Sequence, residues 1–169
     1  GSGTDVGLRT LLKYYAVDPD KDVQIIATRG QTDVAMAALA QGSIDGFFFP
    51  EPAPTLAVRQ GIGFRFLDYG KEGPDALRLI AYNALLTRDD VIDKKPELVA
   101  KIVRAIARAE KNMASNPSIA VPAAQNIISK QLGADVITTI VAEGVPHFKA
   151  EIPRRNVEIL VKTLLDSGQ

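Results

Sequence analysis

The chain has 169 residues, 46% of them hydrophobic, and this composition supports a packed globule rather than a disordered segment. Its 20 basic and 20 acidic residues cancel, so no strong electrostatic field favours nucleic acid or a membrane surface as a partner, and no apolar run approaches the roughly 20 residues that span a membrane. The absence of cysteine excludes disulfides and cysteine-ligated zinc, and the single histidine, His147, cannot by itself form a histidine-based metal site.

The first predicted element is a helix that begins at the turn GSGT, residues 1–4. Asp5 follows Ser2 by three residues, which is the spacing of a capping box. Apolar residues then recur at i, i+3, i+4 and i+7, as on one face of a helix: Leu8, Leu11, Leu12 and Tyr15. Because Gly-Ser pairs are also common remnants of cloning, two interpretations of GSG stay open. We favour a native turn that faces a ligand over a partly tag-derived one.

Helical and strand-like patterns alternate through the rest of the first half. Short apolar runs predict strands at residues 23–28, 44–50 and 64–70. Two segments rich in alanine or proline between them, residues 33–42 and 50–61, predict helices. A strand–helix–strand–helix–strand order is typical of a mainly parallel sheet whose faces are covered by helices. The sequence therefore predicts an α/β fold for this half.

The pattern changes in the second half of the chain. An apolar run at residues 77–87 predicts one more extended strand. Only helical patterns follow it, at residues 96–116, 117–132, 134–143 and 154–165. We therefore expect two domains. The first is an α/β ligand-binding lobe at residues 1–76, and the second, residues 77–169, consists of a strand and C-terminal helices.

Three segments of the chain, GSGTDVGLRTLLKYY, VDPDKDVQII and AALAQGSIDGFFFPEP, resemble the second lobe of solute-binding proteins that serve ABC importers. The similarity is to the branch for nitrate, sulfonate, taurine and thiamine precursors within the type 2 periplasmic binding proteins. In that family an AAL-x-x-G-x-x-D element, residues 37–45 here, precedes a strand that ends with an aromatic residue or proline at the binding cleft.

This resemblance implies a periplasmic-binding-protein-like fold with two lobes that close on the solute, of which the chain would be the C-terminal part. Residues 77–87 would then be the hinge strand, with Tyr82 and Asn83 near the cleft. The C-terminal helices would normally pack on the first lobe. With that lobe missing, we expect exposed apolar surface, or pairing or swapping with another chain.

Ligands of open α/β sheets bind just outside the carboxyl ends of the strands, and three predicted turns would meet at that edge. Together with the hinge pair they give the candidate ligand-binding residues Ser2, Gly3, Thr4, Arg29, Gln31, Phe49, Glu51, Tyr82 and Asn83. Unpaired N–H groups at the first turn favour an anion, Phe49 would stack on the solute, and Glu51 would select an amino group. Each has an ordinary structural alternative, such as a helix cap, a surface arginine, a core phenylalanine or a carboxylate favoured by a helix dipole.

We expect the substrate-binding component of an ABC importer. It would capture a small polar or ionic organic solute, such as a sulfonate, nitrate, taurine or a pyrimidine, in the cleft between lobes without catalysis. Its partners would be the solute and the transporter permease, with no nucleic acid, no cofactor and no metal. Asp89, Asp90 and Asp93 fit the charges of a helix start and lack the spacing of a calcium loop. The resemblance implies a periplasmic or otherwise extracytoplasmic location, as a membrane-anchored lipoprotein.

Two alternatives stay open. The first is an enzyme-like protein of thiamine-pyrimidine biosynthesis, which resembles the same branch. Its activity depends on clustered histidines and cysteines, whereas this chain has one histidine and no cysteine. The second is a ligand-sensing regulatory domain of the same fold. An upstream secretion signal or lipoprotein cysteine would favour transport, and an upstream DNA-binding or signalling segment would favour sensing.

Overall fold

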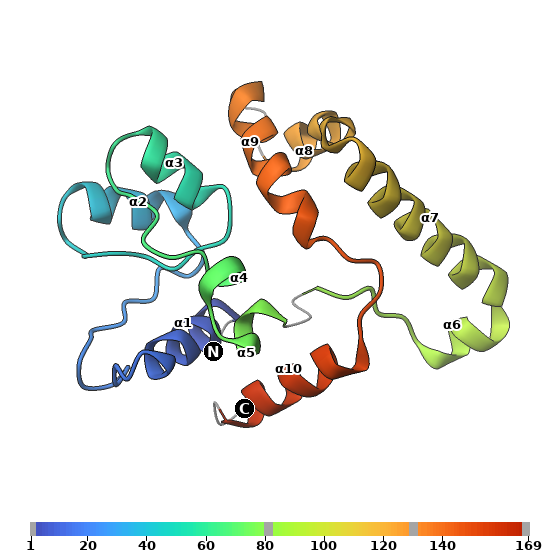
Figure 1. Cartoon of the computed structure of the whole chain (residues 1–169), viewed down its shortest axis with the longest axis horizontal. Coiled ribbons are helices and arrows are strands. Elements are labelled where there is room, and N and C mark those ends of the chain that lie inside the picture. The colour runs from blue at the N-terminus through green and yellow to red at the C-terminus, as the bar shows by residue number, and fades with distance from the viewer. Residues whose placement is uncertain (1–2, 80–82, 129–131, 167–169) are drawn as a thin grey trace. The chain divides into compact units, whose positions relative to one another are not determined.

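The computed structural model describes residues 3–79, 83–128 and 132–166, and Figure 1 shows its helices joined by irregular segments. The elements in chain order are α1 (Gly3–Tyr14), α2 (Thr32–Ala40), α3 (Ala53–Arg59), α4 (Tyr69–Glu72), α5 (Asp75–Arg78), α6 (Asp89–Lys94), α7 (Pro96–Ser115), the 3₁₀ turn η1 (Pro117–Ala120), α8 (Val121–Ile127), α9 (Ala134–Gly144), the 3₁₀ turn η2 (Val145–His147) and α10 (Arg154–Asp166). They form two compact units. Unit 1 consists of residues 1–82 and 153–169, and unit 2 of residues 83–152. The predicted domain boundary after residue 76 stays a prediction.

The predicted α/β fold with a mainly parallel sheet is wrong, because the described residues contain no strand. The segments expected as strands at residues 23–28 and 44–50 are bends or irregular backbone, and the one expected at residues 64–70 is irregular up to Asp68 and then enters α4. A strand forms only where a neighbouring segment completes its ladder of backbone hydrogen bonds, and no such ladder joins these segments in the described chain. Phe64 and Phe66, whose alternation predicted a buried face, are 81% and 86% exposed. Apolar alternation describes one segment at a time and cannot supply the partner that a sheet needs.

The predicted hinge strand at residues 77–87 is also not a strand where the structure describes it. Its first two residues belong to α5, and residues 83–87 are irregular, with Leu85 and Leu86 exposed. The same physical reason applies, since no neighbouring strand of the described chain pairs with this segment. Tyr82 lies outside the described residues.

The predicted helices are confirmed, and their ends follow local chemistry. α7 begins with Pro96, a position where the missing N–H has no intrahelical partner to lose. The Asn116 side chain accepts a hydrogen bond from the Ser118 backbone N–H at 3.2 Å, which caps η1. Pro122 lies in the first turn of α8, so the helical segment predicted at residues 117–132 is divided into η1 and α8. No helix in the described part of the chain has the length and hydropathy needed to cross a membrane.

In unit 1, α1 packs against an aromatic corner of the chain and against α5. A Cβ atom at Gly7 would stand 3.1 Å from Phe48 Cε1 and 3.9 Å from Leu77 Cδ2, so any side chain there would force the Phe48 ring to shift. The Phe48 ring also lies 5.4 Å, centroid to centroid, from the Tyr69 ring. Buried alanines complete the packing of α2 and α3: Ala35, Ala53 and Ala57. The corner at residues 47–51 is therefore packed through Phe48 against both α1 and α4.

In unit 2, α9 supplies the core. Ile137 is fully buried, and it forms an apolar cluster with Val141 and Val145. Residues from α7, η1, α8 and the following turn pack against this cluster: Met113, Ala120, Val121, Ala124, Ile128 and Leu132. The backbone N–H of Ala150 donates to Glu110 Oε2 at 2.9 Å, which ties the segment after η2 back to α7. Unit 2 is thus a small helical bundle with a continuous apolar centre.

Candidate functional site

The corner before α3 carries a polar cluster built around Glu51. Its Oε1 accepts a hydrogen bond from Arg65 Nη2 at 2.7 Å, and its Oε2 accepts one from the Thr55 backbone N–H at 3.3 Å. The same Arg65 nitrogen also donates to Thr55 Oγ1 at 3.3 Å, and Thr55 is buried. Glu51 therefore stabilises the first turn of α3, where a negative charge is favoured, and also binds the segment that follows α3.

The cluster continues from Arg65 to the start of α4. Arg65 Nη1 lies 3.9 Å from Asp68 Oδ2, and Lys71 Nζ lies 3.1 Å from the same oxygen. Asp68 Oδ1 accepts a hydrogen bond from the Gly70 backbone N–H at 3.1 Å, so Asp68 is the N-cap of α4. Two carboxylates and two cations thus alternate in one chain of contacts, which fixes the starts of α3 and α4 relative to each other.

This geometry bears on the predicted role of Glu51 in binding an amino group. Both carboxylate oxygens already have partners, and the side chains of Glu51 and Arg65 are each 28% exposed. A cationic solute would have to compete with the Arg65 guanidinium, whose Nη2 lies 2.7 Å from Glu51 Oε1. The assignment of Glu51 to the ligand stays a prediction, and the structure shows which contacts that role must overcome.

Phe49, the other candidate at this corner, lies edge-to-face against Phe47, with ring centroids 5.8 Å apart and planes at 87°. This is one of the two arrangements that aromatic pairs prefer. The middle ring, Phe48, faces Gly7 and Tyr69 instead. Phe47 and Phe49 are half-buried.

The turn before α2 holds Arg29 and Gln31, and both are exposed. Arg29 and Gly30 have φ values of +53° and +78°, so two successive residues adopt the left-handed region. That conformation is uncommon for a residue with a side chain and is ordinary for glycine. The Gln31 backbone N–H donates to Thr28 O at 3.0 Å, which closes the turn.

At the start of α1, Gly3 is exposed and Thr4 is half-buried. Asp5 Oδ1 accepts a hydrogen bond from Arg9 Nε at 3.2 Å, and Arg9 Nη1 donates to Asp20 Oδ1 at 2.8 Å. The bonds to Asp20 and Asp5 raise the pKa of Arg9 above its ordinary value. Ser2 lies outside the described residues, so the predicted capping box stays a prediction.

The edge on which the candidate residues were expected to meet is absent, because the described chain has no sheet. Each turn makes its own local contacts instead: Gln31 with Thr28, and Glu51 with Thr55 and Arg65. Asn83 is exposed, in the irregular segment that opens unit 2. The ligand-binding roles of all these residues stay predictions.

Sequence reasoning missed four members of the polar cluster: Thr55, Arg65, Asp68 and Lys71. A signal was present for Asp68, since Asp-Tyr-Gly-Lys has an N-cap residue type ahead of a lysine at the i+3 position. Arg65 follows α3 as Glu51 precedes it, and the contact between them depends on how the chain returns after the helix. No group of three or more histidine, cysteine, aspartate or glutamate side chains suited to a metal ion occurs within the described ranges.

The chain was compared with known protein families, curated proteins and solved structures. A model of the NMT1-like family matches residues 1–129, that is, 129 of the 169 residues. The match includes α1 to α8 and every candidate ligand-binding residue. No curated protein and no solved structure matches the chain significantly.

Proposed function

Because the chain belongs to the NMT1-like family, we propose that it is the substrate-binding component of an ABC importer. The family fits a solute-binding role in general, and its match over residues 1–129 is the observation that carries the proposal. The solute we propose is a small polar or ionic organic molecule or oxyanion of the sulfonate, nitrate, taurine or pyrimidine type. The protein would act outside the cytoplasmic membrane and deliver this solute to a permease.

The residues of unit 1 suggest how such a solute would be held. The first turn of α1 is the positive end of the helix dipole, which favours an anionic group next to Gly3 and Thr4. Phe49 is half-buried beside Phe47 and would contact an apolar part of the solute. The contacts of Arg65 and Thr55 keep Glu51 in place at the same corner. A pocket of this kind needs few polar groups on a fixed support.

We propose binding without catalysis. The one histidine, His147, lies exposed in η2 of unit 2, and the chain has no cysteine. Nucleophilic or acid–base catalysis usually pairs such a group with a second side chain within hydrogen-bonding distance. The candidate residues are instead hydroxyl, amide, aromatic and paired charged groups, which suit recognition.

A thermal-shift titration tests the proposal. The purified chain is titrated with taurine, nitrate, a simple carboxylate and an aminopyrimidine. For at least one of them the melting temperature is expected to rise with ligand concentration, because bound ligand adds about 2.7 kcal/mol to the free energy of unfolding at 100 times Kd. NMR of the recovered solute is expected to show it chemically unchanged.

Matched variants connect the binding to the proposed residues. Thr4→Ala is expected to weaken binding about tenfold, because it removes a donor beside the anionic group. Thr139→Ala is the control: Thr139 is half-buried like Thr4, its hydroxyl donates to Asp135 O within α9 of unit 2, and the variant is expected to leave the affinity unchanged. Flat responses to all four solutes would contradict the function, and equal affinities of both variants and the parent would contradict the site.

A further inference from the structure

Asp45 and Gly46 form an exposed dipeptide between α2 and the corner at residues 47–51. It is the one place in the sequence where an aspartate or an asparagine directly precedes a glycine. Such a pair is able to cyclise, because glycine has no side chain that would keep its backbone nitrogen away from the preceding carboxyl group. A folded chain suppresses this reaction where other contacts hold either group. The contacts of Asp45 and Gly46 therefore decide whether it occurs in this protein.

Neither reacting group has a partner in the part of the chain that the structure describes. The Asp45 carboxylate makes no hydrogen bond or ion pair there, and the Gly46 backbone N–H donates to no acceptor. The bonds that end α2 stop just before this dipeptide, where the Ser43 backbone N–H donates to Ala38 O at 2.9 Å. A Cβ atom at Gly46 would meet no atom within 4 Å apart from its chain neighbours, so the space around it is open. An exposed segment without backbone hydrogen bonds needs almost no free energy to change its conformation.

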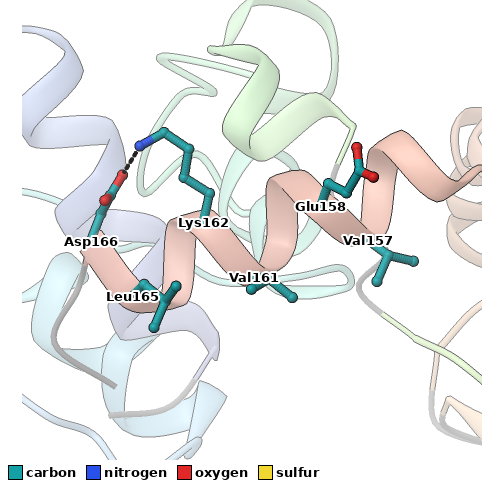
Figure 2. A pocket seen from close by; sticks show the side chains of 6 residues that line it. All are labelled: Val157, Glu158, Val161, Lys162, Leu165 and Asp166. Carbon is teal, nitrogen blue, oxygen red and sulfur yellow. Dashed lines mark hydrogen bonds and ion pairs between the residues drawn. The ribbon is translucent and has the colours of Figure 1, made fainter.

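Two other aspartates of unit 1 show what Asp45 lacks. Asp166 also precedes a small residue, a serine, but its Oδ2 accepts a hydrogen bond from Lys162 Nζ at 2.8 Å (Figure 2). Asp33 is exposed like Asp45, but it lies in the first turn of α2 and a β-branched valine follows it. The helix fixes the backbone around Asp33, and the branched side chain hinders the approach of the following nitrogen. Of the three, Asp45 alone combines a free carboxylate, an irregular backbone and a following glycine.

We propose that Asp45 is a modification site, at which the folded protein forms isoaspartate through a cyclic succinimide. The Gly46 nitrogen attacks Asp45 Cγ and loses its proton. A bond forms between this nitrogen and Cγ, a C–O bond of the protonated carboxyl group breaks, and one water molecule leaves. A second water molecule then opens the ring: attack at the main-chain carbonyl carbon of Asp45 gives isoaspartate, and attack at Cγ restores aspartate.

The product differs from aspartate in its main chain. The chain now passes through Cβ and Cγ of residue 45, so it is one carbon atom longer, and the former main-chain carboxyl group becomes a free carboxylate. This carboxylate is the group that protein isoaspartyl methyltransferases methylate, and at an exposed position such an enzyme has access to it. The inference does not depend on the proposed function.

Peptide mapping of the full chain by liquid chromatography and mass spectrometry, after incubation at physiological temperature, measures the reaction. Isoaspartate separates from aspartate at the same mass, and the succinimide is lighter by one water molecule. Isoaspartate is expected to accumulate at Asp45, with a higher yield than at Asp33 or Asp166. A synthetic peptide of residues 40–50 gives the rate without the fold. The rate in the folded chain is expected to lie within about tenfold of the peptide rate, because opening this segment costs almost no free energy.

Variants test the role of each group. Gly46→Ala is expected to slow the reaction severalfold, because the added methyl group hinders ring closure. Its melting temperature is expected to match that of the parent, since Gly46 is not among the glycines with a positive φ and a Cβ atom there has open space. Asp45→Glu keeps the charge and is expected to abolish the reaction, because the larger ring closes far more slowly. Asp33→Glu, at another exposed aspartate of unit 1, is the control and is expected to leave the yield unchanged.

Three results would overturn the proposal. A rate in the folded chain more than about tenfold below the peptide rate would show that the folded protein protects the dipeptide. A yield at Asp33 or Asp166 that equals or exceeds the yield at Asp45 would exclude Asp45 as the preferred site. An unchanged yield in Gly46→Ala would show that the reaction does not depend on the unhindered nitrogen of Gly46.

Discussion

The two units are held together in different ways. Unit 2 collects α7, η1, α8 and α9 around an apolar cluster centred on the fully buried Ile137. Unit 1 buries mostly small residues near its corner and fixes that corner with a chain of polar contacts through Glu51 and Arg65. Segments close in sequence can build an apolar helical core without a sheet. Where the expected strands find no partners, charged and capping side chains determine the arrangement of the loops instead.

The largest expected effect comes from the core of unit 2. Ile137→Ala is expected to lower the free energy of unfolding of unit 2 by about 3 kcal/mol, through lost apolar burial and the cavity left behind. Hydrogen exchange measured by mass spectrometry would show it as faster exchange in α7 to α9, with α1 to α3 unchanged. Equal loss of hydrogen-exchange protection in both units would contradict the claim that each unit is stabilised by its own contacts.

The polar cluster of unit 1 gives the next largest effect. Glu51→Gln replaces a charge-assisted hydrogen bond to Arg65 with a neutral one, and is expected to destabilise unit 1 by about 1–2 kcal/mol. Glu158→Gln is the matched control, because Glu158 pairs with Arg154 at an exposed site, where such a pair is worth less than about 1 kcal/mol. The comparison is made by hydrogen exchange in dilute solution. Equal destabilisation by the two substitutions would show that the Glu51–Arg65 contact stabilises unit 1 no more than an exposed ion pair does.

The end of α1 offers a stabilising change of about the same size or smaller. Ala16 has a φ of +59° and closes a Schellman motif, with Val17 N bonded to Leu12 O at 2.9 Å. Ala16→Gly removes the strain of a left-handed residue and is expected to raise the stability of unit 1 by about 1 kcal/mol. Gly42, which ends α2 with a φ of +69°, supplies the reverse test. Gly42→Ala is expected to lower the melting temperature, and a change of the same sign for both variants would contradict this account.

The smallest effect concerns the turn after α1. Hydrogen bonds from the Asp20 backbone N–H and from Lys21 lower the pKa of Asp18 below its ordinary value. Because the folded-state pKa is lowered, the stabilisation by Asp18 is present above the unfolded-state pKa and disappears as the pH falls through the folded-state value. Carboxyl NMR of the chain would follow this titration. Lys21→Gln is expected to move the midpoint upward, and an unmoved midpoint would show that Lys21 does not contribute.

Helices were predictable from the sequence and strands were not, for a physical reason. Pro96 at a first helical position and Asn116 at a cap act through bonds within a few residues, so a local pattern contains the necessary information. The run at residues 64–68 has the alternation of a strand, but a strand is completed only by a distant segment. A local pattern does not determine whether a distant segment lies alongside and pairs with the strand.

The candidate site divides in the same way. Glu51 was recognised as a residue whose position, directly before a helix, gives its charge a role. Its partner Arg65 lies 14 residues away and was missed, because the contact depends on the return of the chain after α3. Thr55 was missed although it follows Glu51 by four residues, since any residue type except proline supplies the backbone N–H that Glu51 accepts from, and its hydroxyl contact depends on Arg65.

Isothermal titration calorimetry of the full chain tests the central claim, that this member of the NMT1-like family binds a small solute without converting it. Taurine, nitrate, a carboxylate and an aminopyrimidine are titrated separately. The account predicts saturable heat with one binding site per chain for at least one of them, with the solute recovered intact. The absence of saturable heat with all four, or recovery of a changed solute, would contradict it.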